Sequence, residues 1–431
     1  METDRLFKVF QEHPVVTTDS RDCPEGSVFF ALKGASFNGN RFAMNAIEQG
    51  CAYAVVDEAA YAVDERFILV DDCLRALQLL AREHRRQFAI PVIGITGTNG
   101  KTTTKELVSA VLARKYNVLS TQGNFNNDIG VPKTLLRLDR SHDIAVVEMG
   151  ASHPGDIRTL VELVEPQYGI ITNVGRAHLQ GFGSFEGVVS TKGELYDYLR
   201  GVKDGSIFID CGNDHLKGIA HGLRQICYGL EGSGRLYVEG RLGECAPTLT
   251  FSWRQDGGEW REVKTHLIGS YNILNMLAAA AVGCHFGVAP EDIDEALAGY
   301  RPSNNRSQRE TTPFSHLVVD AYNANPTSME AALRNFGLMR VDHKMVILGD
   351  MKELGDVSHE EHRKVVEQLK GMALEEVWLV GEEFGHTDCA YRKFRDVEEV
   401  KAAIAASRPD HRYILIKGSN SCHLAQLKDI L

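Results

Sequence analysis

Long hydrophobic runs are absent from this sequence. No stretch of the 431 residues approaches the roughly 20 consecutive apolar residues that a membrane-spanning helix needs. The first residues, METDRLFKVFQEHP, also lack the basic start and hydrophobic stretch of a secretory signal. We therefore expect a cytoplasmic protein that does not insert into a membrane.

Positive charge is also scarce. Lys and Arg together number 47 against 58 Asp and Glu, so the formal net charge is −11. Binding to nucleic acid or anionic lipid generally relies on an excess of positive charge. We expect no nucleic-acid partner, although a local basic pocket for a small anionic substrate is compatible with this composition.

The nine cysteines follow no disulfide or metal-binding pattern. They are scattered, odd in number and never spaced as C-x-x-C. This distribution favours reduced structural thiols over disulfides or a zinc site. The cysteines are Cys23, Cys51, Cys73, Cys211, Cys227, Cys245, Cys284, Cys389 and Cys422.

Length and hydrophobic patterning indicate an α/β protein of three domains in series. At ~150 residues per domain, 431 residues correspond to about three domains. Short apolar runs, turns and a helical pattern between residues 28 and 88 predict a small N-terminal α/β domain over 1–88. A third alternation of strands and helices predicts a C-terminal domain over 310–431, with a last helix at 422–431.

The central segment, 89–309, carries the patterns of a parallel sheet. Apolar runs at 91–96, 143–150, 168–174 and 205–210 alternate with helical spacing, which predicts strands covered by helices on both faces. Residues 225–268 interrupt this rhythm with strand patterns around a Gln-Asp-Gly-Gly turn. We expect an antiparallel hairpin insertion there.

The strongest local motif is PVIGITGTNGKTTTKELVSAVL, which is a strand, a glycine-rich turn, Lys-Thr and a helix. This order directs backbone N–H groups and the positive helix end toward a phosphate. Gly97 and Gly100 allow close approach, Lys101 can neutralise phosphate charge, and the Thr102 hydroxyl can bind Mg²⁺. The common spacing would require glycine where Ile95 stands, but the four features together favour an ATP or GTP site over an incidental turn.

The segment TGTNGKTTT resembles the ATP loop of the Mur ligase family, which includes peptidoglycan amino-acid ligases and folylpolyglutamate synthases. Further motifs follow in that family's order along nearly the whole chain. The resemblance implies a UDP-sugar-binding N-terminal domain, a central ATPase domain and a C-terminal Rossmann-like ligase domain. These motifs are TDSRDCPEGSVFFAL, TQGNFNNDIGVPKTLL, VVEMGASHPGDI, ITNVGRAHLQGFGSFEGV, TKGELYD, VVDAYNANPTSM and ILGDMKELG.

Within the family, NANPTSM and GNFNNDIGVP are most similar to the branch that joins D-alanyl-D-alanine to UDP-N-acetylmuramoyl-tripeptide. The resemblance implies that ATP phosphorylates the substrate carboxylate and that the incoming amine then attacks the acyl phosphate. Lysine and a diamino acid both stay open as the third residue of the tripeptide. We expect a monomer.

The resemblance also assigns the ATP contacts. Asn272 and Asn275 lie three residues apart on a predicted helix and share a face, although helix capping is an alternative for Asn272. The Arg306 guanidinium is suited to the γ-phosphate. The assigned residues are Gly97, Thr98, Asn99, Gly100, Lys101, Thr102, Thr103, Asn272, Asn275, Arg306 and Asp320.

The magnesium ligands implied by the resemblance are Thr102, Glu148, His178 and Lys192. Glu148 also ends a predicted parallel strand, where open α/β sheets bind ligands. A solvated acid, a surface histidine and a solvated lysine are the alternatives. In related ligases the matching lysine is carbamylated, which requires a neutral amine that burial would favour. Catalytic roles fall to Lys101, His178, Lys192 and Arg306.

The substrate contacts implied by the resemblance come from all three domains. Arg21 and Lys33 would suit a pyrophosphate. The Asp-Gly-His that the family often has is Asn38, Gly39 and Asn40 here, so an Asn-Gly turn is the alternative for these residues. The predicted contacts are Ser20, Arg21, Lys33, Asn38, Asn126, Asn127, Tyr322, Asn323 and Asn325, with Lys417 and Ser419 as possible dipeptide contacts.

Two alternative functions follow from the same motifs. One is another ligase of the family, acting on a different amino acid or on folate. The other is a nucleotide-dependent switch that binds ATP without ligation. The joint presence of Thr102, Glu148, His178, Lys192 and Arg306 argues against a switch.

Overall fold

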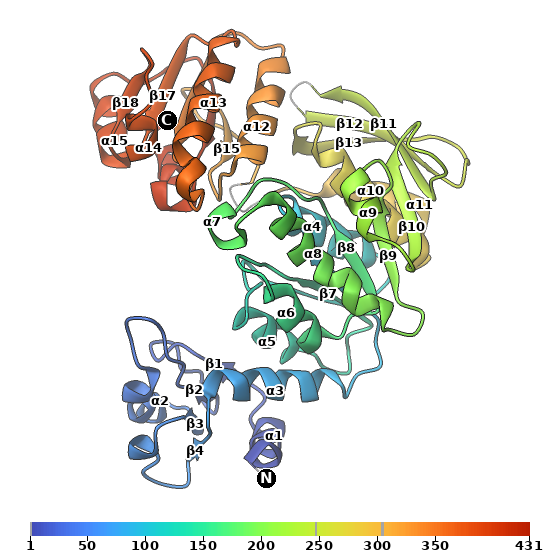
Figure 1. Ribbon diagram of the computed structural model, residues 1–431, viewed down its shortest axis with the longest axis vertical. Coiled ribbons are helices and arrows are strands. Elements are labelled where there is room, and N and C mark those ends of the chain that lie inside the picture. The colour runs from blue at the N-terminus through green and yellow to red at the C-terminus, as the bar shows by residue number, and fades with distance from the viewer. Residues whose placement is uncertain (1, 246–247, 303–305) are drawn as a thin grey trace. The chain divides into compact units, whose positions relative to one another are not determined.

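The computed structural model describes residues 2–245, 248–302 and 306–431 (Figure 1). The chain forms two compact units. The first comprises Met1–Gly94, Tyr116–Ala151 and Gly155–Tyr168, and the second comprises Ile95–Lys115, Ser152–Pro154 and Gly169–Leu431. In the described ranges, every helix is too short or too polar to cross a membrane.

The first unit begins with a four-stranded parallel sheet in the order β1-β2-β3-β4. Helix α3 is the helix predicted before residue 88, and the Asp72 side chain caps its start by accepting a hydrogen bond from Arg75 N at 2.7 Å. Helix α1 was not predicted. The elements are α1 (Glu2–Glu12), β1 (Val16–Thr17), β2 (Val28–Phe30), α2 (Ala43–Glu48), β3 (Tyr53–Val56), β4 (Phe67–Leu69) and α3 (Cys73–Arg85).

The rest of the first unit packs onto α3. Strands β6 (Val118–Ser120) and β7 (Ile144–Glu148) pair in parallel, and α3 contacts both α5 (Gly130–Leu135) and α6 (Asp156–Val164). The buried Arg85 at the end of α3 donates from Nε to Val164 O at 3.1 Å, which satisfies a carbonyl at the end of α6. Strand β5 (Val92–Thr96) begins in this unit and ends in the second.

The second unit contains the strand order β13-β12-β11-β10-β9-β8. The predicted antiparallel hairpin is confirmed, because β12 and β13 pair antiparallel on either side of a turn at Asp256 and Gly257. It extends the parallel sheet directly, since β11 pairs in parallel with β10, a strand that was not predicted. The strands are β8 (Tyr168–Ile171), β9 (Ser206–Asp210), β10 (Arg224–Leu230), β11 (Val238–Cys245), β12 (Thr248–Gln255) and β13 (Arg261–Ile268).

Helix α10 is buried along most of its length between α4 and strands β9 to β12. Leu107, Val108 and Val111 on α4 are fully buried, as the helical spacing predicts. Gly283 permits this packing, because a Cβ there would lie 2.5 Å from Val111 Cγ1. The helices of this part are α4 (Lys101–Leu112), α7 (Leu179–Phe182), α8 (Phe185–Arg200), α9 (Asp214–Ile219), α10 (Asn272–His285) and α11 (Pro290–Gly299).

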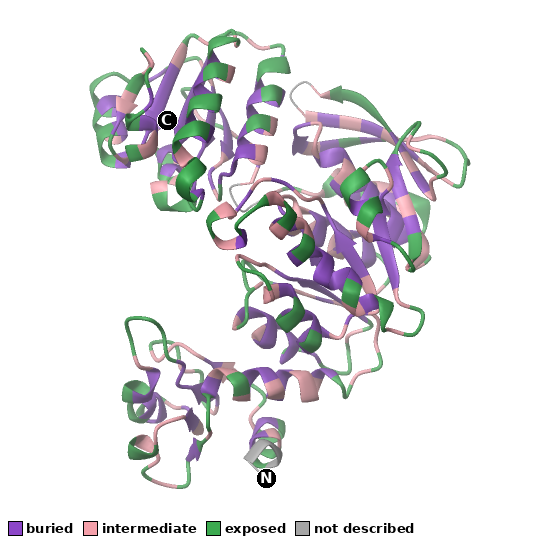
Figure 2. Cartoon of the chain, viewed as in Figure 1, coloured by how far each residue is buried: buried purple, intermediate pink, exposed green. Residues whose placement is uncertain are grey.

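The C-terminal part of the second unit is a six-stranded sheet in the order β14-β15-β19-β16-β17-β18. All its strands run parallel except β14, and Figure 2 shows its central strands as buried. Alternate residues of these strands belong to two separate hydrophobic cores, one on each face of the sheet. One core includes residues of α12 and α13, and the other includes residues of α15. The elements are β14 (Gln308–Thr311), β15 (His316–Asp320), α12 (Pro326–Leu338), β16 (Lys344–Gly349), α13 (Ser358–Lys370), β17 (Glu376–Val380), α14 (Glu382–Gly385), β18 (Arg392–Phe394), α15 (Val397–Ala406) and β19 (Tyr413–Lys417).

Two predictions are wrong in detail. The last segment is not an α-helix but two 3-10 turns, Asn420–Cys422 and Leu424–Asp429, because His423 between them has a φ of 53°. The expectation of reduced thiols fails for Cys211 and Cys227, which form a disulfide with a Cα–Cα distance of 5.6 Å. Cys211 directly follows β9 and Cys227 lies in the neighbouring parallel β10, so pairing of the strands brings the two residues together.

Candidate functional site

The phosphate loop joins β5 to α4, and its two glycines are required by shape. Gly97 has a φ of 141°, and a Cβ there would lie 2.0 Å from Thr172 Oγ1. Gly100 has a φ of 78° directly before α4, and its Cβ would lie 2.7 Å from Asn275 Oδ1. Both positions therefore exclude larger side chains through backbone conformation and through contact.

The segment after β8 holds this loop in place. Thr98 N donates to Asn173 O at 2.9 Å, and Asn99 N donates to Asn173 Oδ1 at 3.0 Å. Thr172 Oγ1 donates in turn to Asn99 O at 2.6 Å. Sequence reasoning missed Thr172 and Asn173, although two polar residues near the end of the predicted strand 168–174 were the available signal; the observed strand ends at Ile171. The loop is thus shaped by neighbouring protein groups.

Lys101 and Thr102 begin α4 at the end of the loop. Lys101 Nζ donates to Gly97 O at 2.9 Å and to Thr98 O at 3.1 Å, so its ammonium group lies over the loop. The Thr102 side chain is buried, whereas Thr103 is half-buried. A cation, a hydroxyl and the positive helix end consequently share one small region, which suits a polyphosphate.

The two predicted adenine-contact residues support the loop from α10. Asn275 Oδ1 accepts a hydrogen bond from Thr104 Oγ1 at 3.1 Å, and Asn275 Nδ2 donates to Asn272 Oδ1 at 2.9 Å. The shared helix face is therefore confirmed. Asn272 Nδ2 donates back to Ile268 O at 2.8 Å, so this side chain does not cap the helix start.

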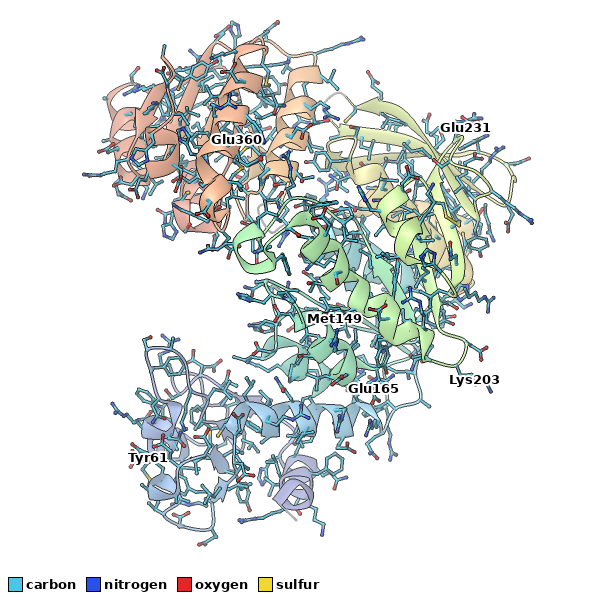
Figure 3. All side chains as sticks on the ribbon, viewed as in Figure 1. Tyr61, Met149, Glu165, Lys203, Glu231 and Glu360 are labelled. Carbon is cyan, nitrogen blue, oxygen red and sulfur yellow. A yellow bond between two sulfur atoms is a disulfide. The ribbon has the colours of Figure 1, made fainter. Side chains whose placement is uncertain are left out.

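Glu148 lies at the end of β7 in the first unit, and its side chain is fully buried. Asn126 Nδ2 donates to Glu148 Oε1 at 2.8 Å, so a predicted metal ligand and a predicted substrate residue are in contact. The Oδ1 atom of the next residue, Asn127, instead accepts a hydrogen bond from Gly130 N at 2.8 Å, which satisfies a donor at the start of α5. Met149, labelled in Figure 3, follows Glu148 directly.

His178 and Lys192 both lie near the ring of Phe182. His178 precedes α7 with a φ of 50°, and its ring centroid lies 6.1 Å from that of Phe182. Lys192 is buried on α8, with Nζ 5.2 Å from the same ring centroid. His178 Nδ1 also meets the carboxylate of Glu353, a residue that sequence reasoning missed within ILGDMKELG. Hydrogen bonding to His178 lowers the pKa of Glu353, against the opposing effect of burial.

Arg306 lies just before β14 and Asp320 is the last residue of β15, both strands of the C-terminal sheet. The Arg306 guanidinium lies 3.8 Å from the centroid of the Tyr322 ring, and its buried Nε meets no hydrogen-bond partner in the described part of the chain. Asp320 Oδ2 accepts from the buried Lys417 Nζ at 2.6 Å. The exposed Asn323 accepts from Ala324 N at 2.8 Å, as its alternative role in a turn predicts.

The N-terminal residues form a polar network of their own. Lys33 Nζ lies 2.8 Å from Asp57 Oδ1 and 3.1 Å from Glu58 Oε1. Asn38 donates to Glu58 and accepts from the buried Asn40, as an Asn-Gly turn would allow. Burial raises the pKa of Asp57, but hydrogen bonds from Lys33 and Asn40 outweigh it and the net shift is downward.

Ser20 and Arg21 lie on a loop after β1. Ser20 is half-buried, whereas the Arg21 side chain is 86% exposed and pairs with Asp19 at 2.7 Å. Among the contacts of the described residues, neither Ser20 nor Arg21 takes part in the polar network around Lys33. The structure therefore gathers Lys33 and Asn38, and leaves Arg21 outside this network, paired with Asp19 at the surface.

Comparisons with known proteins place these features in a family. Sequence models match residues 14–85 ("Mur ligase family, catalytic domain"), 95–283 ("Mur ligase middle domain") and 305–420 ("Mur ligase, glutamate ligase domain"). The UDP-N-acetylmuramoyl-tripeptide--D-alanyl-D-alanine ligase of Bacillus subtilis is 36% identical over 370 residues, which cover 85% of this chain and 79% of that protein. The predicted order of three domains is confirmed.

Solved structures agree with the sequence comparison. A crystal structure of MurF from Acinetobacter baumannii superposes with a TM-score of 0.86 at 31% identity, covering 96% of this chain and 92% of that one. MurF from Thermotoga maritima in complex with ADP superposes with a TM-score of 0.84 at 26% identity, covering 96% of both chains. The predicted α/β architecture is confirmed.

Proposed function

Because the chain belongs to the Mur ligase family, we propose that it joins D-alanyl-D-alanine to UDP-N-acetylmuramoyl-tripeptide with ATP, in peptidoglycan precursor synthesis. The observation that carries this proposal is the phosphate loop that Thr172 and Asn173 hold in place, with Lys101 folded over it. The names of the relatives supply the substrates. We further propose that the protein acts as a monomer in the cytoplasm. Light scattering on the purified protein tests its monomeric state.

The chemistry explains why a phosphate loop is needed. A carboxylate resists attack by an amine, because it is already anionic and has no good leaving group. Transfer of the γ-phosphoryl group from ATP to a carboxylate oxygen yields ADP and an acyl phosphate. The amine then attacks the acyl carbon, loses a proton, and expels phosphate from a tetrahedral intermediate. Lys101 and Arg306 would offset the negative charge that gathers during phosphoryl transfer.

The residues present fit Mg²⁺. A hydroxyl at Thr102 and a fully buried carboxylate at Glu148 are hard oxygen donors, and a cation would stabilise the buried charge. Thr102 and Glu148 would each ligate Mg²⁺ and His178 would contact a second Mg²⁺, as the family resemblance implies, and these ions would supply charge neutralisation at the phosphates.

We also propose that Lys192 is carbamylated. Its burial disfavours the ammonium form, and the neutral amine can add CO₂ to give a carbamate and a proton. The resulting anion could bind or position a second Mg²⁺. Protein equilibrated with ¹³C-bicarbonate should show a carbamate carbon resonance that is absent from the Lys192→Ala variant. An identical spectrum in both proteins would exclude the modification.

The decisive experiment measures ADP release with Mg-ATP and UDP-N-acetylmuramoyl-tripeptide. D-alanyl-D-alanine should stimulate release and yield a pentapeptide product by mass, whereas free D-alanine, L-glutamate or no amine should not. Stimulation by L-glutamate with a folate in place of the UDP-sugar would support a folylpolyglutamate synthase. ATP binding without ADP release in any mixture would support a nucleotide switch and exclude ligation.

A further inference from the structure

The start of α12 makes a side-chain contact with the phosphate loop. Asn325 Nδ2 donates to Asn99 Oδ1 at 2.8 Å, and Asn99 Nδ2 lies 3.4 Å from Asn325 Oδ1. These two residues are 226 positions apart in the sequence. Asn325 is 7% exposed and Asn99 is half-buried, so the amide pair is partly shielded from water. A partly buried amide pair of this kind favours one relative placement of the two segments.

Asn325 is held rigidly on its own side. It is the N-cap of α12, where its Oδ1 accepts from Ser328 N at 2.9 Å while Asn325 N donates to Ser328 Oγ at 3.1 Å. This reciprocal pair is a capping box. The amide that contacts the phosphate loop is therefore the same group that starts the helix, so a shift of one is transmitted to the other.

A second connection runs through the segment after β8. Thr98 Oγ1 in the phosphate loop accepts from Gly175 N at 3.0 Å. The next residue, Arg176, donates from its backbone N to Thr327 Oγ1 in the first turn of α12, also at 3.0 Å. A Cβ on Gly175 would lie 2.9 Å from Thr327 Oγ1, so the approach is close. Together with the Asn99–Asn325 pair, these contacts join three segments to one another: the phosphate loop, the segment after β8 and the first turn of α12.

An ion pair also links the segment after β8 to α13. The Arg176 guanidinium donates to Glu361 Oε1 at 3.0 Å, and the Glu361 side chain is 7% exposed. Gln180 N also donates to Glu353 O at 3.2 Å. The segment that carries His178 is thus attached to the C-terminal sheet domain on both sides of the histidine. Helices α7, α12 and α13 are labelled in Figure 1.

We propose that Asn325 is a positioning residue that couples the phosphate loop to the segment 320–325. That segment carries Asp320 and Tyr322, and Arg306 stacks on Tyr322. Nucleotide binding that further restrains Asn99 would thereby restrain the start of α12 and the segment 320–325. The inference rests on the proposed function for its kinetic consequence, but the coupling itself is measurable without turnover. Sequence reasoning predicted Asn325 as a substrate contact, and the amide pair assigns it this different role.

The first test uses hydrogen exchange with Mg-ADP as the probe and Asn325→Ser as the variant. Serine is also a good N-cap but is too short to reach Asn99. In the unsubstituted protein, ADP should protect both 97–103 and 321–330. In the variant, protection should persist at 97–103 and fall at 321–330. Equal protection of 321–330 in both proteins would overturn the proposal. Asn213→Ser is the matched control, because the Asn213 side chain also caps a helix, accepting from Leu216 N at the start of α9.

The second test is a double-mutant cycle on dipeptide-dependent ADP release. Asn325→Ser should lower kcat roughly 10-fold with the Kd of ADP changed less than about twofold, because misplaced groups slow the reaction step. Asn99→Ala should lower kcat at least as much, because it removes a predicted ATP contact together with the amide pair. The double variant should be no slower than the slower single variant. Additive losses would overturn the proposal. Absence of turnover in the unsubstituted protein, with the exchange result intact, would refute the ligase function and leave the coupling standing.

Discussion

Two regions predicted to bind phosphate are constructed differently. The phosphate loop has its backbone held by Thr172 and Asn173 and its glycines enclosed by neighbouring groups. The predicted pyrophosphate residues of the first unit, Arg21 and Lys33, are paired with carboxylates, and the Arg21 side chain is largely exposed. The first region is held by hydrogen bonds from neighbouring protein groups, whereas the cations of the second would exchange carboxylates for phosphates.

This difference has a general consequence. A site made of backbone N–H groups needs a particular main-chain path, and its residues tolerate little change. A site made of long charged side chains needs only charge and reach, because these side chains can reorient at modest cost. Substitutions in the two regions should therefore differ in kind, with loss of folding or chemistry in the first and altered substrate affinity in the second.

The largest effect is expected from Lys101→Ala. It removes the cation over the loop and two hydrogen bonds that hold the loop. Dipeptide-dependent ADP release should fall on the order of 10²–10³-fold in kcat, as for removal of other charge-stabilising donors. Lys203→Ala is the control, since Lys203 lies in an exposed turn before β9 (Figure 3). A similar loss in both variants would contradict the assignment.

Gly97→Ala should destabilise the fold as well as abolish nucleotide binding. The positive φ and the close contact with Thr172 Oγ1 together should lower the free energy of unfolding by about 3 kcal/mol in urea. Gly222→Ala separates the two causes, because Gly222 has a φ of 73° and open space around it. That control should lose only about 1 kcal/mol. Equal losses would mean that contact with Thr172 contributes nothing.

Arg21→Ala should leave thermal stability unchanged, because the exposed pair with Asp19 contributes little. The KM for the UDP-sugar substrate should rise roughly 10-fold with kcat retained. A charge-assisted contact that is equally strong in the ground state and in the transition state affects substrate binding alone. Arg66→Ala, at another exposed pair with Asp64, is the control. An unchanged KM would remove Arg21 from the substrate site.

The smallest effect concerns acid sensitivity. The folded-state pKa of Asp57 is lowered overall, so its stabilising contribution is present above the unfolded pKa of about 3.9 and is lost as pH falls through the folded pKa. Lys33→Ala removes a hydrogen bond that lowers this pKa. The variant's urea midpoint should therefore change less between pH 6 and pH 3 than that of the unsubstituted protein. The same comparison in an Asp57→Asn background should show no difference.

The phosphate loop was predictable because its signal is local. The apolar run before Gly97, the Gly-Lys-Thr sequence and the helical spacing of Leu107 and Val111 each follow from nearby residues. The predicted face shared by Asn272 and Asn275 was equally local. Such features depend on backbone geometry over a few residues, which side-chain type largely determines.

The partners of these residues were not predictable in the same way. Glu353 meets His178 and Asn325 meets Asn99 because strands and helices distant in sequence are adjacent in the fold. The Cys211–Cys227 disulfide follows from the pairing of β9 with β10, which linear spacing does not reveal. The role of each side chain depends on what it contacts, and contact is a property of packing.

By itself, the sequence determined the class of fold, the place of the phosphate loop and, through its ordered motifs, the family. Hydrophobic period and glycine position are sufficient for this, because they restrict the backbone locally. Asn126 and Asn127 are neighbouring residues of one type. Only the tertiary structure decided that Asn126 hydrogen-bonds to Glu148 while Asn127 hydrogen-bonds to the start of α5. Their difference arises because the fold directs adjacent side chains toward different partners.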